Sequence, residues 1–339
     1  MFLSVLHKRV LRLLTAVFLF VSLSFAPYNP GPSLIPVYCT NIPPFPVLIP
    51  SGNDPSPLGN FESLTIPLKR AGRLYLVEAR IDGVSGNLVF DTGATGLVLN
   101  RTYFRNHLLS DNVLANGITG AAGTINTNTV NRVDISDLYF ENIPADVADL
   151  GHIENQRAVK IIGLLGFNMI KSFEIVLDAS RNELQLNRTD HKGNCLKAAL
   201  AEPVFDYIQK IEPWHSVLLL KGKIGGKILN FCFDTGAETN AINSHSSRNV
   251  LNTITVNRRS NLRGAGSVAT EVLFGIMNDF NLDNSPLNGM ETIITDLDPL
   301  SDAYGVAIDG MLGFNFIQKG IITINLAKKQ FGIRFSKAI

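Results

Sequence analysis

The tripeptide Asp-Thr-Gly, followed by Ala, occurs twice in this sequence. The copies are Asp91–Ala94 and Asp234–Ala237, and each ends an apolar run. One such tripeptide is weak evidence of function, because strands end in turns and Asp and Gly are common turn residues. Two copies at matching places of a chain need another explanation, since a turn alone does not require the same Thr in both.

Two aspartates held about 3 Å apart can do acid–base chemistry, because both carboxylates cannot ionise together and they share one proton. One then acts as general base on a water molecule, while the protonated one donates to a carbonyl oxygen of the substrate. The Thr hydroxyl can hydrogen-bond across the pair, and Gly lets backbone approach the carboxylate closely. Such a pair needs two similar halves in a two-fold arrangement.

The chain repeats much more than this tripeptide. Residues 161–170, IIGLLGFNMI, recur as residues 308–317, IDGMLGFNFI, and a strand–turn–strand pattern follows each copy. In both halves a strand, a Gly-containing turn and a second strand lead to the tripeptide, and a Gly-rich stretch follows it. Many short strands with frequent turns predict an all-β fold. We expect only short helices, near residues 167–171 and 314–319.

The repeat divides the chain into two similar β domains. The predicted segments are a signal peptide or N-terminal anchor at 1–26, a Pro-rich linker or pro-segment at 27–60, an N-terminal domain at 61–190, an inter-domain linker at 191–212 and a C-terminal domain at 213–339. A chain of 339 residues is long enough for two domains of ordinary size.

The N-terminal segment has the pattern of an export signal. A basic head precedes the apolar run Leu13–Phe25, which is short for a membrane span, and small residues precede Pro27. Pro27 is unfavourable for cleavage, so an uncleaved membrane anchor and a buried N-terminal helix stay open as alternatives. We expect an exported protein, located in a periplasm, on a cell surface or in the medium.

The repeated motifs resemble those of the retropepsin-like aspartic proteases, most closely the bacterial members with two such halves in one chain. The two Asp-Thr-Gly-Ala stretches look like the active-site loops of that family. Leu164–Gly166 and Met311–Gly313 resemble its element of two hydrophobic residues and Gly, which packs behind each loop. The resemblance covers roughly residues 62–187 and 214–335.

The resemblance implies two tandem acid-protease β-barrel domains that form a bilobal substrate cleft on a pseudo-two-fold axis. It assigns Asp91 and Asp234 as the catalytic pair and Thr92 and Thr235 as the residues that brace it. The remaining candidates are the loop glycines and the Gly-rich stretches that lie where the family has its flap, a mobile cover over the cleft. They are Gly93, Gly236, Gly120, Ala121, Ala122, Gly123, Gly264, Ala265 and Gly266. An ordinary Gly turn is the alternative for both Gly-rich stretches.

The sequence departs from the pepsin-like pattern beside each aspartate. Ala94 and Ala237 stand where pepsin-like enzymes commonly have Ser, whose hydroxyl can donate to a carboxylate and favour its charged form. Without that donor the pKa values of the pair rise. We therefore expect a pH optimum that is less acidic than that of pepsin.

A second departure removes an ion pair. Phe167 and Phe314 stand where retroviral enzymes have an Arg that pairs with an acid just after the active-site loop. The positions of that acid hold Thr95 and Glu238, so we expect the ion pair to be missing from both halves. Glu238 is then free to contact a substrate backbone amide or amine, or it is a solvated surface residue.

The first functional hypothesis is an exported aspartic endopeptidase that acts on peptide or protein substrates as a monomer. A non-catalytic peptide-binding or scaffolding protein with the same fold is the alternative, although a binder has little reason to bury two acids. Pairing of each half with its counterpart in another chain is a third arrangement, which the short joining segment disfavours. The net charge of +1 argues against nucleic acid as a partner. The sequence has no zinc or phosphate-binding motif, so no metal or organic cofactor is expected.

The three cysteines form no disulfide framework. Cys232 lies in an apolar strand pattern and is expected to be a buried free thiol. A bridge between Cys39 and Cys195 stays open.

Overall fold

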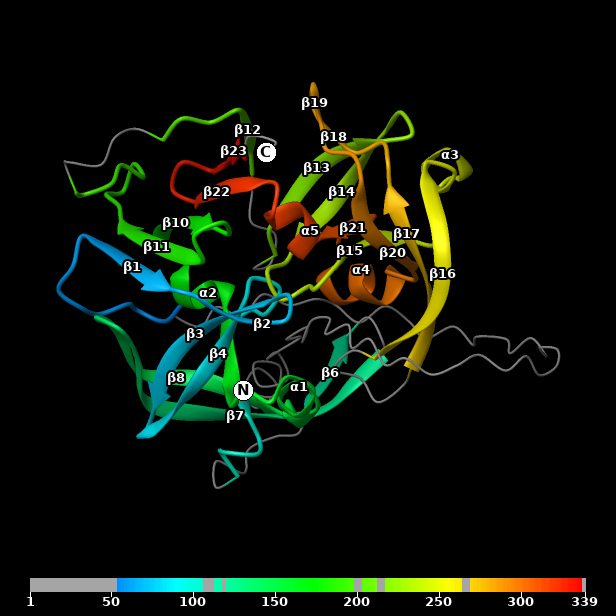
Figure 1. The fold of residues 1–339 in the computed structure, drawn as a ribbon. Helices are drawn as coiled ribbons and strands as arrows, with labels where there is room; N and C mark the ends of the chain where they lie inside the picture. The colour runs from blue at the N-terminus through cyan, green and yellow to red at the C-terminus, as the bar shows by residue number, and fades with distance from the viewer. Residues whose placement is uncertain are drawn as a thin grey trace, which may run out of the picture.

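The computed structural model describes residues 54–105, 113–117, 120–197, 203–211, 217–263 and 269–336 (Figure 1). The predicted export signal and nearly all of the Pro-rich segment lie outside these ranges, so their predictions stay untested. Within the described ranges, no helix combines the length and the apolar character needed to cross a membrane.

The first half of the chain is a strongly curled sheet of eight strands. Its spatial order is β2-β3-β4-β9-β5-β8-β7-β6, and the long strand β7 also pairs with β3, which closes the sheet into a barrel. The strands are β2 (Lys69–Ala71), β3 (Leu74–Ile81), β4 (Val84–Asp91), β5 (Leu97–Asn100), β6 (Val113–Gly117), β7 (Gly120–Ile135), β8 (Leu138–Ala148) and β9 (Ile161–Gly166).

The second half repeats this order. Its sheet runs β16-β17-β20-β15-β21-β14-β13-β18-β19. Read from β13 to β16, the strands β13, β14, β21, β15, β20, β17 and β16 occupy the same positions in order as β3, β4, β9, β5, β8, β7 and β6 of the first sheet. The strands are β13 (Leu219–Ile224), β14 (Lys227–Phe233), β15 (Asn240–Asn243), β16 (Ile254–Arg263), β17 (Ala269–Met277), β18 (Asn281–Leu282), β19 (Ser285–Pro286), β20 (Met290–Thr295) and β21 (Gly310–Leu312). The predicted all-β fold of two tandem barrels is confirmed.

A third sheet joins the two halves. It has six strands in the order β1-β11-β10-β22-β23-β12, half of them from each repeat (Figure 1). The strands are β1 (Ser63–Pro67), β10 (Phe173–Asp178), β11 (Glu183–Arg188), β12 (Tyr207–Lys210), β22 (Gly320–Asn325) and β23 (Gln330–Phe335). The two closing hairpins predicted from the sequence meet where β10 pairs with β22 in antiparallel register, with Val176 opposite Thr323. The pseudo-two-fold axis therefore passes between these strands.

Five short helices accompany the sheets. They are α1 (Gly151–Arg157), α2 (Phe167–Ile170), α3 (Arg248–Leu251), α4 (Asp298–Tyr304) and α5 (Phe314–Ile317). The expected helices near 167–171 and 314–319 are confirmed as α2 and α5. The expectation of no others is wrong. Helices α1 and α4 span two turns and follow Leu150 and Leu297, which give no side-chain cap. Helix α4 nevertheless begins with Asp298 and Pro299, a start signal that the prediction overlooked.

A buried polar contact fastens the junction of the two halves. Glu174 on β10 accepts hydrogen bonds from Asn187 Nδ2 of β11 at 3.2 Å and from Asn325 Nδ2 of β22 at 2.9 Å. All three side chains are buried. The Glu174 carboxylate therefore ties a strand of the first half to a strand of the second.

We predict that Glu174→Ala lowers the free energy of unfolding by roughly 2–4 kcal/mol, because two buried amide groups lose their acceptor. Glu174→Gln keeps one acceptor oxygen and serves as the control, with a smaller loss. Urea unfolding of the two variants and the wild type measures both values. Equal, small losses in the two variants would show that the amides find other partners.

Candidate active site

The two parallel strand pairs β4–β9 and β14–β21 bring the motifs to the same place in each half. Asp91 at the end of β4 lies opposite Gly166, and Phe233, just before Asp234, lies opposite Leu312. A β-carbon on Gly166 would lie 2.2 Å from the Gly96 carbonyl oxygen, and one on Gly313 would lie 2.5 Å from the Ala237 carbonyl oxygen. Glycine is therefore required behind each loop, since any side chain there would push the loop away.

Both aspartates are fully buried, and backbone N–H groups of their own loops bind them. Asp91 Oδ1 accepts from the N–H of Gly93 at 2.9 Å and from that of Ala94 at 3.1 Å. Asp234 Oδ1 accepts from the N–H of Gly236 at 2.8 Å. Asp followed by Gly closes such turns readily, which is the local reason why the sequence folds this way.

The two threonines form a reciprocal contact between the loops. The Thr92 N–H donates to Thr235 Oγ1, and the Thr235 N–H donates to Thr92 Oγ1, each at 3.0 Å. Each hydroxyl in turn donates to a backbone carbonyl of the opposite half, Thr92 to Phe233 at 3.1 Å and Thr235 to Phe90 at 2.8 Å. Four buried hydrogen bonds therefore fix one loop against the other.

The contact between the loops leaves no room for a side chain at Gly236. A β-carbon there would lie 2.6 Å from the carboxyl carbon of Asp91. The Asp91 carboxyl group thus lies against the loop of Asp234, and the pKa of each aspartate depends on the other carboxyl group. The Oδ2 atom of each aspartate is buried and has no hydrogen-bond partner among the described residues. A proton shared between the two carboxyl groups would satisfy both atoms.

Burial sets the electrostatics of the pair. It raises the pKa of Asp91 to about 6, against the lowering effect of the hydrogen bonds from Asp234, Gly93 and Ala94. Burial and then the charge of Asp91 raise the pKa of Asp234 well above its ordinary value. Asp91 Oδ1 accepts from two N–H groups of its own loop and Asp234 Oδ1 from one, which favours the negative charge on Asp91.

Ala94 and Ala237 are fully buried beside the pair. They offer no hydroxyl, and the raised pKa values agree in direction with the expectation drawn from these two residues. The expected pH optimum stays a prediction.

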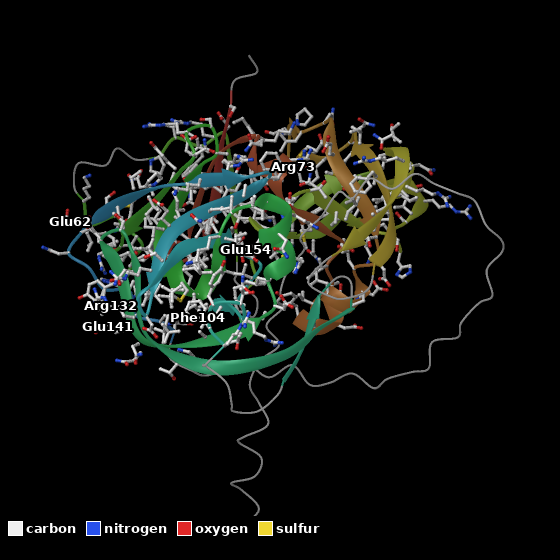
Figure 2. All side chains as sticks on the ribbon, turned by 60° about the horizontal axis from the view of Figure 1, so that its bottom comes forward. Glu62, Arg73, Phe104, Arg132, Glu141 and Glu154 are labelled. Carbon is white, nitrogen blue, oxygen red and sulfur yellow. The ribbon has the colours of Figure 1, made fainter. Side chains whose placement is uncertain are left out.

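The expectation that Glu238 lacks an ion pair is wrong. Glu238 is buried, and its carboxylate pairs with the guanidinium of Arg157, the last residue of α1 in the other half. Arg73 of the first half donates to the Glu238 carbonyl oxygen at 3.3 Å and lies where the two halves meet (Figure 2). The Phe314 ring receives the guanidinium groups of Arg70 and Arg73 at 4.7 and 5.5 Å. Glu238 is thus neither free nor solvated, and we drop it as a substrate-binding candidate.

The two predicted flap stretches have different outcomes. Gly120–Gly123 begins β7 at the end of the β6–β7 hairpin, with Gly117 opposite Gly120 and Asn116 opposite Ala121. Strand β6 also lies against α4 of the second half. Gly264, Ala265 and Gly266 lie outside the described residues, between the paired strands β16 and β17. A role of either stretch in binding substrate stays a prediction.

Sequence reasoning missed three side chains that reach these loops from the opposite half. Two are Arg73 and Arg157, which contact Glu238, and the third is Tyr304 at the end of α4, whose hydroxyl donates to the Gly93 carbonyl oxygen at 3.0 Å. No local signal marks them, because each lies far along the chain from the loop it contacts.

Cys232 is buried and free, as expected, and burial raises its pKa well above the usual value. Cys39 lies outside the described residues, so its bridge to Cys195 is untested.

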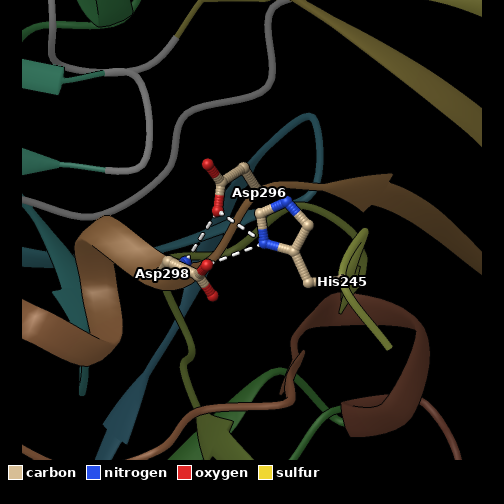
Figure 3. Close-up of side chains that lie close together, drawn as sticks. All are labelled: His245, Asp296 and Asp298. Carbon is tan, nitrogen blue, oxygen red and sulfur yellow. Dashed lines mark hydrogen bonds and ion pairs between the residues drawn. The ribbon is translucent and has the colours of Figure 1, made fainter. Parts of the chain in front are cut away.

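Three side chains with metal-binding atoms lie together at the start of α4. They are His245, Asp296 and Asp298, and all three are exposed (Figure 3). His245 Nδ1 lies 2.7 Å from Asp298 Oδ2, and Asn243 Nδ2 donates to Asp298 Oδ1 at 2.8 Å. These hydrogen bonds brace the first turn of α4 and account for the cluster, so we assign no metal to it.

Comparison with known proteins agrees with this geometry. A family model described as "Aspartyl protease" matches residues 77–169 and 220–316, more than half of the chain, and each match contains one Asp-Thr-Gly motif. Among solved structures, the chain is similar to a retropepsin-like aspartic protease from Rickettsia conorii, with 21% identity, 40% of this chain and 96% of that chain covered, and a TM-score of 0.27. A search of curated proteins gave no match. The family model is therefore the basis of the assignment.

We predict that Thr92→Val lowers the free energy of unfolding by roughly 2–4 kcal/mol, because the buried Thr235 N–H and Phe233 carbonyl lose their partner. Thr92→Ser keeps both hydrogen bonds and loses one methyl group, so it should lose only about 1 kcal/mol. Guanidinium unfolding of both variants provides the comparison. A serine variant as unstable as the valine variant would contradict the importance of these hydrogen bonds.

The raised pKa values predict a pH-dependent gain of stability in Asp234→Asn. In the wild type, the folded state binds more protons than the unfolded state between the ordinary aspartate pKa of 3.8 and the folded pKa of Asp234, which lies well above it. Stability from this pair is therefore present at low pH and is lost as the pH rises through that window. The variant should therefore gain stability relative to the wild type as the pH rises from 4 to 7, and near pH 4 the difference should be smallest.

Thermal unfolding of both proteins between pH 4 and pH 7 measures this difference. Asp137→Asn, which changes an exposed aspartate of the first half, is the control and should show no such trend. A gain that is the same at both ends of the pH range would rule out the raised pKa as its cause.

Proposed function

Because this chain belongs to the aspartyl protease family, in its retropepsin-like group with two halves in one chain, we propose that it is an aspartic endopeptidase. The observation that carries the proposal is that Asp91 and Asp234 are buried on facing loops, where the pKa of each depends on the other. Family membership supports hydrolysis, and the geometry of the pair supports peptide bonds as the target.

In the proposed reaction, the ionised Asp91 accepts a proton from a water molecule, and the water oxygen attacks the carbonyl carbon of the scissile peptide bond. Asp234 donates its proton to the carbonyl oxygen, which gives a neutral tetrahedral intermediate. Collapse of this intermediate breaks the C–N bond: the amine nitrogen takes the proton held by Asp91, and Asp234 takes a proton back from a hydroxyl of the intermediate as the carbonyl re-forms, which restores the starting pair. No covalent enzyme intermediate forms.

The surroundings of the pair suit this chemistry. A site without competing water strengthens every electrostatic interaction at the developing charge. The pair must hold one proton to act, so its activity begins as the pH rises toward the Asp91 pKa of about 6. This agrees with an optimum less acidic than that of pepsin.

Substrate entry requires a conformational opening, since both carboxyl groups are fully covered. The β6–β7 hairpin, with Gly120–Gly123 at its end, is the part of the first half that we propose as the moving cover. The substrate is then an extended peptide in a cleft between the halves.

The remaining parts of the proposal concern assembly and location. Both aspartates come from one chain, so we propose a monomer that needs no second copy to complete the pair. We also propose export, directed by the N-terminal segment. The non-catalytic alternative gains no support from the pair, because burying a group with a raised pKa reduces stability at neutral pH and brings a binder no benefit.

We predict that the full chain cleaves members of a diverse peptide library between pH 4 and 7. Asp91→Asn and Asp234→Asn should each reduce kcat/KM by about 1,000-fold or more, because either change removes the shared proton. Mass spectrometry of the products measures cleavage and its sequence preference.

Asp137→Asn is again the matched control, and it should keep full activity. Folded wild-type protein that cleaves nothing, and that binds peptides as well as its two active-site variants do, would favour the non-catalytic alternative.

A further inference from the structure

Tyr304 belongs to the core of one half and touches the active-site loop of the other. Its ring is buried among apolar residues of the second half that include Leu297, Leu300 and Met311. Its hydroxyl donates to the carbonyl oxygen of Gly93 at 3.0 Å. Gly93 follows Asp91 by two positions, so the phenol reaches the loop that holds the general base.

The Gly93 carbonyl and the Ala94 N–H belong to the same planar peptide group. The Ala94 N–H donates to Asp91 Oδ1 at 3.1 Å. A donor that fixes the carbonyl therefore also fixes the direction of this N–H. Hydrogen bonds arranged in such a chain polarise one another, so the phenol strengthens the bond that Asp91 receives.

The peptide needs such support, because Gly93 has no side chain to restrict its backbone. On its N–H side the Gly93–Ala94 group is held by Asp91, whose Oδ1 and backbone oxygen accept from the Ala94 N–H at 3.1 and 3.2 Å. The Tyr304 hydroxyl holds the carbonyl side of the same group.

The internal repeat shows that this contact has a counterpart. Helices α1 and α4 occupy equivalent places, each directly before β9 or β21, and each ends at a residue in the left-handed conformation, Ala158 or Gly305. Their last residues, Arg157 and Tyr304, both stand nine positions before the Gly of the Leu-Gly-Phe element. Arg157 crosses to Glu238, and Tyr304 crosses to Gly93. Each half thus sends the end of the same helix to the active-site loop of the other half.

We propose that Tyr304 is a positioning residue for Asp91, acting across the two halves through the Gly93–Ala94 peptide group. This inference rests on the proposed function, because it assigns Asp91 as the base. Tyr304 itself does not touch the substrate or the attacking water in this assignment.

The Tyr304 hydroxyl is suited to donate a hydrogen bond at every pH at which the aspartate pair titrates, because it stays protonated. Burial, and then the charges of Cys232, Asp234 and Asp91, raise the pKa of Tyr304 well above its usual value. Cys232 comes from β14, and the two aspartates come from the facing loops. The hydroxyl therefore keeps its proton over the whole range in which the aspartate pair titrates.

The chain offers a matched control in Tyr75. This tyrosine of β3 is also buried, and its hydroxyl accepts a hydrogen bond from Gln318 Nε2 of the other half at 2.6 Å. Tyr75→Phe and Tyr304→Phe each remove one oxygen and one buried hydrogen bond between the halves. Only Tyr304 contacts an active-site loop.

The experiment measures the pH dependence of kcat and of kcat/KM for the wild type and both variants. Tyr304→Phe should lower kcat by roughly 3- to 10-fold, leave KM nearly unchanged and move the acidic limb about half a pH unit upward. The shift is upward because a weaker hydrogen bond to Asp91 raises its pKa. Tyr75→Phe should lose similar stability and keep the wild-type pH profile.

A second readout needs no turnover. Carbon-13 NMR of the aspartate carboxyl groups in the full chain follows the titration of Asp91 directly, and Tyr304→Phe should move it upward by the same amount. Incorporation of 3-fluorotyrosine at position 304 strengthens the donor and should move the titration downward, which provides a test even where the phenylalanine variant fails to fold.

An Asp91 titration that neither change at position 304 moves, or that Tyr75→Phe moves equally, would overturn the inference. If the wild type cleaves no peptide, the proposed function fails, while the NMR titration still decides whether Tyr304 acts on Asp91.

Discussion

The structure depends on holding two carboxyl groups in contact inside the protein. Each charge buried without a partner costs several kcal/mol, so the pair is tolerable only with a shared proton and a rigid frame. The reciprocal hydrogen bonds of Thr92 and Thr235 supply the nearest part of that frame. The pairing of β10 with β22 supplies the outer part, since it fixes the two halves at the same axis. Gly166 and Gly313, which lie behind the two loops, have no side chain and so let the loops pack closely against the neighbouring strands.

Features that depend on local sequence were predictable. The repeated tripeptide, the Leu-Gly-Phe element and the closing hairpins each carry their own signal within a short stretch, and duplication made each signal visible twice. The equivalent strand order of the two barrels follows from that duplication. The predicted pair Asp91 and Asp234 is brought together because each aspartate ends the same strand of its own half.

Contacts between the halves were not predictable in the same way. Glu238 is four positions after Asp234, and its partner Arg157 lies far earlier in the chain, on a helix with no capping signal. The sequence indicated correctly that position 314 supplies no Arg. It gave no sign that Arg157, in the other half, pairs with Glu238 instead. Tyr304 escaped notice for the same reason, because only the assembled barrels bring it to Gly93.

The duplicated scaffold also explains why its two sides differ. In a pair of identical halves the two aspartates are equivalent, and the shared proton has no preferred position. Here Asp91 receives two backbone hydrogen bonds from its own loop and Asp234 receives one. The crossing contacts differ as well, with an ion pair on the loop of Asp234 and a phenol on the loop of Asp91. Joining the halves in one chain lets each side carry its own residues, and this asymmetry is the basis on which we propose Asp91 as the base and Asp234 as the acid.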